Sequence, residues 1–270
     1  MPYRSAVALL ALALLAPTTA QAKAWTQPEG DGYAKVWLRG IFGGDAFLAD
    51  GEIAESEGYA DVSLRHYVEY GLTDKWTLLT YGAPAGVASY GDESSAYVGP
   101  LAVGLRRGLT DGPFQVAAEA HYGYAPPVGD DDLAPAGSAL RYFPTVDTHF
   151  AVGELQAGYG FGWGWTVVSA GVQWNSNDDV DTAVIGLAQL GVKLTRTVFV
   201  EAHLVPYEPL GDVEETNVAG TGQTRYLGFG LGASWWVTES VGLSASFDGA
   251  AYAESNAATP SFSVGVEGRF

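Results

Sequence analysis

The last nine residues, FSVGVEGRF at positions 262–270, decide the fold class of this chain. Phe262, Val264 and Val266 alternate with polar or small residues, and the sequence stops on the aromatic Phe270. Because successive side chains of a β-strand point to opposite faces, this pattern predicts a strand with one apolar and one polar face. Such a strand needs a different environment on each side of its sheet.

The first 22 residues have the three parts of a secretory signal peptide. Arg4 supplies the positive charge, residues 6–16 are apolar, and Ala20-Gln21-Ala22 is an A-x-A cleavage site. An apolar run of about 11 residues is too short to cross a bilayer as a helix, so we expect cleavage rather than a retained anchor. No cysteine follows the site, which excludes a lipoprotein.

The composition favours a sheet-rich exported protein. The chain has 36 Gly, 15 Tyr and 8 Trp but no Cys, and no apolar run is long enough for a transmembrane helix. Glycine and aromatic residues with little lysine suit a β-wall better than a helical enzyme. The net charge of −18 makes nucleic acid an improbable partner.

Alternation with a period of two continues through the chain and predicts twelve strands. Most are about 9–12 residues long, the length that a tilted strand needs to cross a membrane. The predicted ranges are 33–42, 59–70, 76–82, 97–107, 114–124, 149–160, 165–174, 184–194, 198–207, 225–236, 241–249 and 262–270.

The connections between these strands alternate in length, as they do in transmembrane barrels. Short ones are predicted at 71–75, 108–113, 161–164, 195–197 and 237–240, and long ones at 43–58, 83–96, 125–148, 175–183, 208–224 and 250–261. The sequence therefore predicts an all-β, transmembrane, antiparallel up-and-down barrel over 32–270 with both termini in the periplasm. Residues 23–31 are a short periplasmic lead-in, and a soluble β-sandwich is the structural rival.

The polar faces of the strands are predicted to line the lumen. Across the closing seam Glu267 should lie near Lys35 and Arg39, and buried charges persist only when they are paired or wet. Glycines such as Gly228, Gly230 and Gly232 leave space that is either open or filled from opposite strands. The predicted lumen-lining residues are Lys35, Trp37, Arg39, Asp61, Arg65, Tyr67, Glu69, Glu119, His121, Glu154, Gln173, Lys193, Glu201, His203, Glu267 and Arg269.

Two predicted strands contain the same tripeptide, Glu-Ala-His, at 119–121 and 201–203. Each Glu and His share a face, which suits a metal or proton site or, more simply, a hydrogen-bonded pair. The two tripeptides lie on the fifth and ninth predicted strands, four positions apart around the wall and too far for one compact tetrahedral site, so no metal site is predicted. His66 falls on the lipid-facing register, and without a Gly-x-Ser-x-Gly elbow or a catalytic trio we predict that the protein is not an enzyme.

Acidic residues crowd the long connections. We expect a solvated outer surface there, and the alternative is that divalent cations bridge these carboxylates to lipopolysaccharide. The clusters are Asp130–Asp132, Asp178, Asp179 and Asp181, and Glu208, Asp212, Glu214 and Glu215.

The closing strand resembles the last strand of bacterial outer-membrane β-barrels, and this resemblance implies that the assembly machinery reads Phe270. The lead-in AWTQP at 24–28 and the turn YGLTDKW at 70–76 are similar to those of porin-like barrels grouped with the meta-pathway phenol-degradation outer-membrane proteins. That resemblance implies passive transport of small molecules, hydrophobic ones included, and carries over no functional residue.

The first hypothesis is therefore an outer-membrane channel or transporter that needs no cofactor and contacts membrane lipid and lipopolysaccharide. The second is a closed structural or adhesin-like barrel whose acidic loops make the contacts, and the third is an outer-membrane hydrolase.

Overall fold

The structure, a computed structural model, describes residues 24–270, so the predicted signal peptide lies outside the described residues. Within this range no helix is long and apolar enough to span a bilayer. The strands are β1 (Gly32–Phe47), β2 (Ile53–Thr73), β3 (Trp76–Tyr90), β4 (Glu93–Tyr97), β5 (Leu101–Gly108), β6 (Phe114–Ala125), β7 (Thr148–Phe161), β8 (Gly164–Asn175), β9 (Ala183–Lys193), β10 (Val198–Pro209), β11 (Arg225–Trp236), β12 (Val241–Glu254), β13 (Asn256–Ala257) and β14 (Ser261–Arg269).

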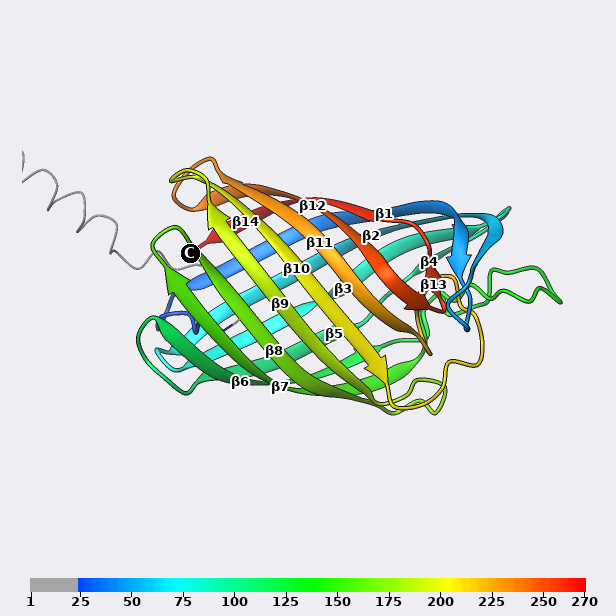
Figure 1. Cartoon of the computed structure of the whole chain (residues 1–270), viewed down its shortest axis with the longest axis horizontal. Coiled ribbons are helices and arrows are strands. Elements are labelled where there is room, and N and C mark those ends of the chain that lie inside the picture. Colours follow the sequence, from blue (N-terminus) through cyan, green and yellow to red (C-terminus); the bar gives the residue numbers. More distant parts are fainter. Residues whose placement is uncertain (1–23) are drawn as a thin grey trace, which may run out of the picture.

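Twelve of these strands form a closed wall in which each pairs antiparallel with its neighbours in the chain (Figure 1). The wall closes because β1 pairs with β2 on one side and with the C-terminal β14 on the other. The short strands β4 and β13 add to β3 and β1. The predicted twelve-stranded up-and-down barrel is confirmed.

The barrel is apolar outside and polar inside. On β14, Phe262 and Val264 are 56% and 63% exposed, whereas Ser263 and Glu267 on the other face are 8% and 3% exposed. This inversion of the usual soluble arrangement is what a wall surrounded by hydrocarbon requires. The alternation predicted for FSVGVEGRF is confirmed.

The strands at the start of the barrel are longer than predicted. The ranges 43–58 and 83–96 were expected to be loops, but β1 runs to Phe47, β2 begins at Ile53, and β3 continues to Tyr90. The β1–β2 ladder continues to a tight turn in which Gly51 has φ +83° and the Leu48 amide donates to the Glu52 carbonyl. Backbone pairing needs no apolar alternation, so the alternation pattern ends before the strands β1, β2 and β3 do.

The two ends of the barrel differ. We call the end that holds the short connections and Phe270 the turn end, and the opposite end the loop end (Figure 1). At the loop end, Leu133 and Tyr142 of the 126–147 connection and Val218 of the 210–224 connection pack with Tyr59 and Tyr90. Burial raises the pKa of the Tyr142 hydroxyl. These two connections form what we call the loop cap.

Polar side chains hold the loop cap together. The side-chain oxygen of Asn217 accepts a hydrogen bond from the backbone amide of Phe143 at 3.0 Å. The backbone amide of Asn217 donates to the Ser255 hydroxyl at 2.8 Å. Asp132 pairs with Arg141 at 2.5 Å. At least one of the predicted acidic surface residues is therefore a structural partner within the cap.

Candidate functional site

The turn end of the interior is organised around Arg106 on β5. Its side chain is fully buried, and it alternates along the strand with the exposed Leu105. Its Nη1 donates to Glu69 on β2 at 2.7 Å, and its Nε donates to Glu119 on β6 at 2.5 Å. A buried cation is stable only when charge and hydrogen bonds are both satisfied, and here one guanidinium joins three strands.

Further side chains extend this network around the wall. Tyr67 accepts from Nη2 of Arg106 at 3.0 Å and donates to Glu69. The Nε2 atom of His121 lies 2.5 Å from Oε1 of Glu119, which is the hydrogen-bonded pairing expected for the first Glu-Ala-His tripeptide. Glu154 lies opposite Glu119 in the β6–β7 register and accepts from Gln156 at 3.1 Å. We call this set the Arg106 network.

The lead-in enters the barrel and joins the Arg106 network. The carbonyl oxygen of Trp25 accepts from Arg106 at 3.0 Å, and the side-chain amide of Gln27 donates to Glu69 at 2.5 Å. Ala24 is fully buried against Trp165 and Val167 of β8. The residues expected as a periplasmic lead-in therefore occupy the turn end of the lumen.

Side chains of neighbouring strands cover several glycines of the wall, but not Gly153 or Gly228. A Cβ at Gly230 would lie 2.2 Å from His203 and 2.3 Å from Asp248, and one at Gly232 would lie 3.0 Å from Glu201. A Cβ at Gly191 would lie 2.1 Å from the Trp165 ring. The expected fillers were large residues from opposite strands, but these glycines instead let neighbouring side chains lie flat along the wall.

The closing seam has the predicted register with different partners. Lys35 is directly opposite Glu267 in the β1–β14 pairing. However, the Lys35 ammonium lies 5.3 Å from the Trp37 ring, and Glu267 accepts from Tyr33 at 2.9 Å.

The other predicted lumen residues occupy the inward register of their strands. Arg269 stacks 3.8 Å from the Trp236 ring, and Glu201 accepts from Gln189 at 2.7 Å. Their role in a conduction path stays a prediction. The remaining inward-register residues of the predicted set are Trp37, Arg39, Asp61, Arg65, Gln173 and His203.

His203 and His66 do not have the arrangement of a catalytic serine–histidine pair. His203 lies 3.0 Å from Asp248, while the Ser246 hydroxyl donates to the other oxygen of Asp248 at 3.1 Å. The carboxylate is between serine and histidine, whereas nucleophile activation needs the histidine in the middle. His66 contacts Thr80 at 3.3 Å, and residues 24–270 contain no cluster of three metal-ligating side chains.

Arg106, Asp248, Trp25 and Gln27 were not among the predicted site residues. The signal for Arg106 was present, because the alternation in LAVGLRRG puts it on the face opposite Leu105. Nothing in the residues of the lead-in indicated that it folds inward.

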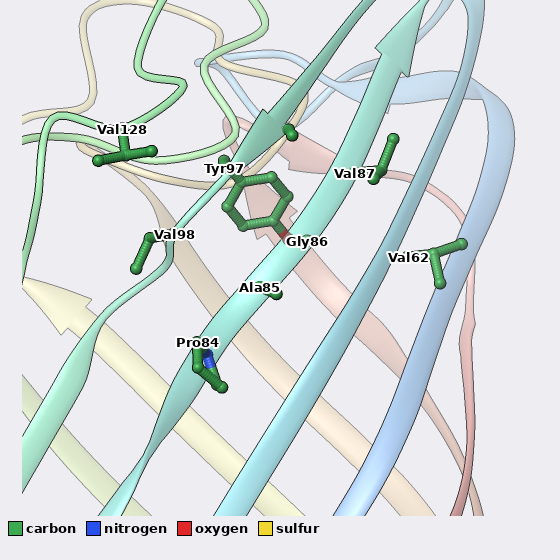
Figure 2. A pocket seen from close by; sticks show the side chains of 9 residues that line it. Val62, Pro84, Ala85, Gly86, Val87, Tyr97, Val98 and Val128 are labelled. Carbon is green, nitrogen blue, oxygen red and sulfur yellow. The ribbon is translucent and has the colours of Figure 1, made fainter.

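An apolar groove of about 380 Å³ lies where β3 separates from the chain leading into β5. Figure 2 shows Pro84, Val87 and Val98 around it, with the Tyr97 ring at its inner side. The Tyr97 hydroxyl donates to Asp61 at 2.6 Å. Tyr97 therefore lies between an apolar groove and the charged interior.

Comparison with known proteins agrees with this architecture. No family model and no curated protein matches the chain. Among solved structures, the COG4313 outer membrane channel from Pseudomonas putida F1 is similar with a TM-score of 0.62 and 16% identity over 93% of this chain and 99% of that one. The KdgM porin has a TM-score of 0.53 and 6% identity over 88% and 99%.

The translocator domain of the autotransporter NalP from Neisseria meningitidis has a TM-score of 0.51 and 12% identity over 99% and 97%. At such low identities the likeness shows the fold alone. The chain has the fold of the bacterial outer-membrane β-barrels.

Proposed function

We propose that this protein is a non-enzymatic outer-membrane channel that lets small solutes cross passively. The observation that carries the proposal is the inversion of its faces, with apolar side chains outside and an ionisable network enclosed inside. Charges are costly to bury, so a wall selected only to fill a barrel would not need so many of them. Two of the similar structures are an outer membrane channel and a porin, which supports the same class.

We place the controlled step of this channel at the lead-in. It is bound to the Arg106 network by a few hydrogen bonds rather than by the continuous ladder that holds the wall. Hydrogen bonds to charged groups are worth about 1.5–3 kcal/mol each, so release of this segment costs several kcal/mol but leaves the backbone ladder of the wall intact. A path then opens at the turn end.

Hydrophobic solutes are included in the proposal because of the groove beside Tyr97. Its lining is almost wholly aliphatic or aromatic, and it opens on the wall that lipid would surround. Lipid, lipopolysaccharide and, through Phe270, the assembly machinery are the partners that this location supplies.

The test is single-channel recording of refolded residues 23–270 in a planar bilayer, with reversal potentials measured in a salt gradient. Stable conductance steps are expected, and a variant lacking residues 24–28 should give larger steps. Repeated insertion without conductance in both proteins would overturn the proposal.

The loop cap favours the second candidate, a closed structural or adhesin-like barrel. Its buried cluster joins two connections to the inner face of β2 and β3, as expected of a lid built to stay shut. Silence of the variant lacking residues 24–28 is the result that this candidate predicts.

A further inference from the structure

Arg39 and Arg65, at mid-height in the barrel, lack carboxylate partners of the kind that Arg106 has. Within residues 24–270, Arg106 pairs with two carboxylates, but Arg39 on β1 and Arg65 on β2 form no ion pair. The Arg65 Nε makes one hydrogen bond, at 3.3 Å to Ser63. The chain has 31 acidic residues against 13 lysines and arginines, so partners were not scarce.

The two guanidinium groups are close to each other. Arg39 is opposite Ser63 in the β1–β2 register, which puts it diagonally next to Arg65. Both charges act on the Tyr226 ring of β11, and each acts on the other. Holding two cations together in a partly dehydrated interior is unfavourable unless an anion joins them.

The nearby carboxylates are bonded to other groups, although the second oxygen of Asp61 is buried without a hydrogen-bond partner among residues 24–270. Asp61 acts electrostatically on both arginines, but one of its oxygens accepts from Tyr97 at 2.6 Å. Asp248 is paired with His203 at 3.0 Å. Asp61 is diagonal to Arg39 in the β1–β2 register, as Arg65 is, so two guanidinium charges share one carboxylate that is not already paired with a cation.

Aromatic rings complete the surroundings. Tyr226 stacks on Tyr207 with centroids 5.4 Å apart and an angle of 10°. Trp37 is opposite Arg65 in the register. Guanidinium groups bind planar carboxylates through two parallel hydrogen bonds, and ring faces add favourable contact with an aromatic body.

We propose that Arg39 and Arg65 form a binding site for the carboxylate of a small aromatic organic anion within the lumen. This inference names the solute class for the proposed channel, so it depends on that function. The ring of the solute would lie among Tyr226, Tyr97 and Trp37.

The test is calorimetric titration of sodium benzoate into the refolded barrel in detergent, which needs no conduction. Saturable binding is expected, and benzyl alcohol, with the same ring but no charge, should bind at least about tenfold more weakly because charge-assisted hydrogen bonds are lost. Acetate separates the contribution of the ring.

Three variants locate the site. Arg39→Gln with Arg65→Gln should weaken benzoate binding about tenfold or more, since both charged donors are removed. Asp61→Asn should strengthen it, because a competing negative charge is lost. Lys75→Gln is the control, since Lys75 is exposed at a turn and pairs only with Asp111.

Equal binding of benzoate and benzyl alcohol, or benzoate binding unchanged in the double variant, would overturn the inference. Circular dichroism of the double variant confirms that it has folded. Conductance recorded in parallel separates the two proposals. A barrel that conducts but does not bind benzoate would support the channel function and overturn the proposed binding site. A barrel that binds benzoate but does not conduct would support the binding site and overturn the channel function.

Discussion

At the scale of single residues, the side chain on which most depends is Arg106. Arg106→Met keeps an unbranched chain but leaves Glu69 and Glu119 buried beside each other without their cation. Removing one partner of a buried ion pair costs about 3–5 kcal/mol, so the free energy of unfolding should fall by that amount. Guanidinium-induced unfolding of the refolded barrel in micelles measures it.

The matched control for this change is the next residue along the strand. Arg107 points outward, with its guanidinium 5.3 Å from the Trp76 ring. Arg107→Met should cost about 1 kcal/mol or less, the value of an exposed cation–π contact. Equal losses in the two variants would show that the Arg106 network does not stabilise the barrel.

At the scale of elements, the lead-in is held where it meets β2. A Cβ at Gly71 would lie 1.9 Å from the carbonyl oxygen of Pro28, so Gly71→Ala must displace one of the two backbones. We expect the lead-in to move, with faster amide exchange over residues 24–31 and larger conductance steps. Hydrogen exchange by mass spectrometry and bilayer recording provide the two measurements.

Gly44→Ala is the control for that experiment, because a Cβ at Gly44 meets no atom within 4 Å. Its exchange and conductance should match those of the unchanged protein. If Gly71→Ala behaved in the same way, the lead-in would not be the controlled step.

The loop cap provides a second prediction at this scale. Asn217→Ala removes the two side-chain hydrogen bonds to Phe143, which are among those that join the 126–147 connection to the 210–224 connection. Amide exchange in both connections should rise while the wall stays protected. Thr238→Ala, which removes bonds confined to the 237–240 connection and the start of β12 at the turn end, should leave the cap unchanged.

The sequence predicted the strands better than the interior, for a physical reason. Period-two alternation follows from having lipid on one side, so it marks each membrane-crossing segment, as in β11, whose bounds match at 225–236. The extra length of β1–β3 depends on backbone pairing, which leaves no such pattern. Lys35, Glu201 and Arg106 each have several inward-facing groups within reach. Which of these groups they contact depends on packing in three dimensions, which the sequence pattern does not show.

At the scale of the whole molecule, Phe270 closes the wall and is the residue that we propose the assembly machinery recognises. Its amide and carbonyl both bond to Gly32 of β1, at 3.1 and 2.7 Å, so the last residue helps to seal the wall. Deleting Phe270 should sharply lower outer-membrane yield in cells while spontaneous folding into vesicles is reduced much less. Heat-modifiable gel mobility and membrane fractionation measure the two yields.

Replacement of Phe270 by tyrosine is the control, because it keeps a terminal aromatic ring. Its yield in cells should stay close to that of the unchanged protein. Equal loss in cells and in vesicles for the deletion would assign Phe270 to sealing the wall alone.

The length of β2 has a consequence for the loop end, which the predicted periplasmic termini would place outside the cell. Twenty-one residues at about 3.3 Å each, tilted by about 40°, rise roughly 50 Å, while the apolar band of such a barrel is about 25 Å tall. The β1–β2 hairpin therefore stands above the lipid as a stiff ribbon. An antibody or a phage would encounter a fixed shape there rather than a flexible loop, and an epitope grafted near Gly51 would be displayed in one orientation.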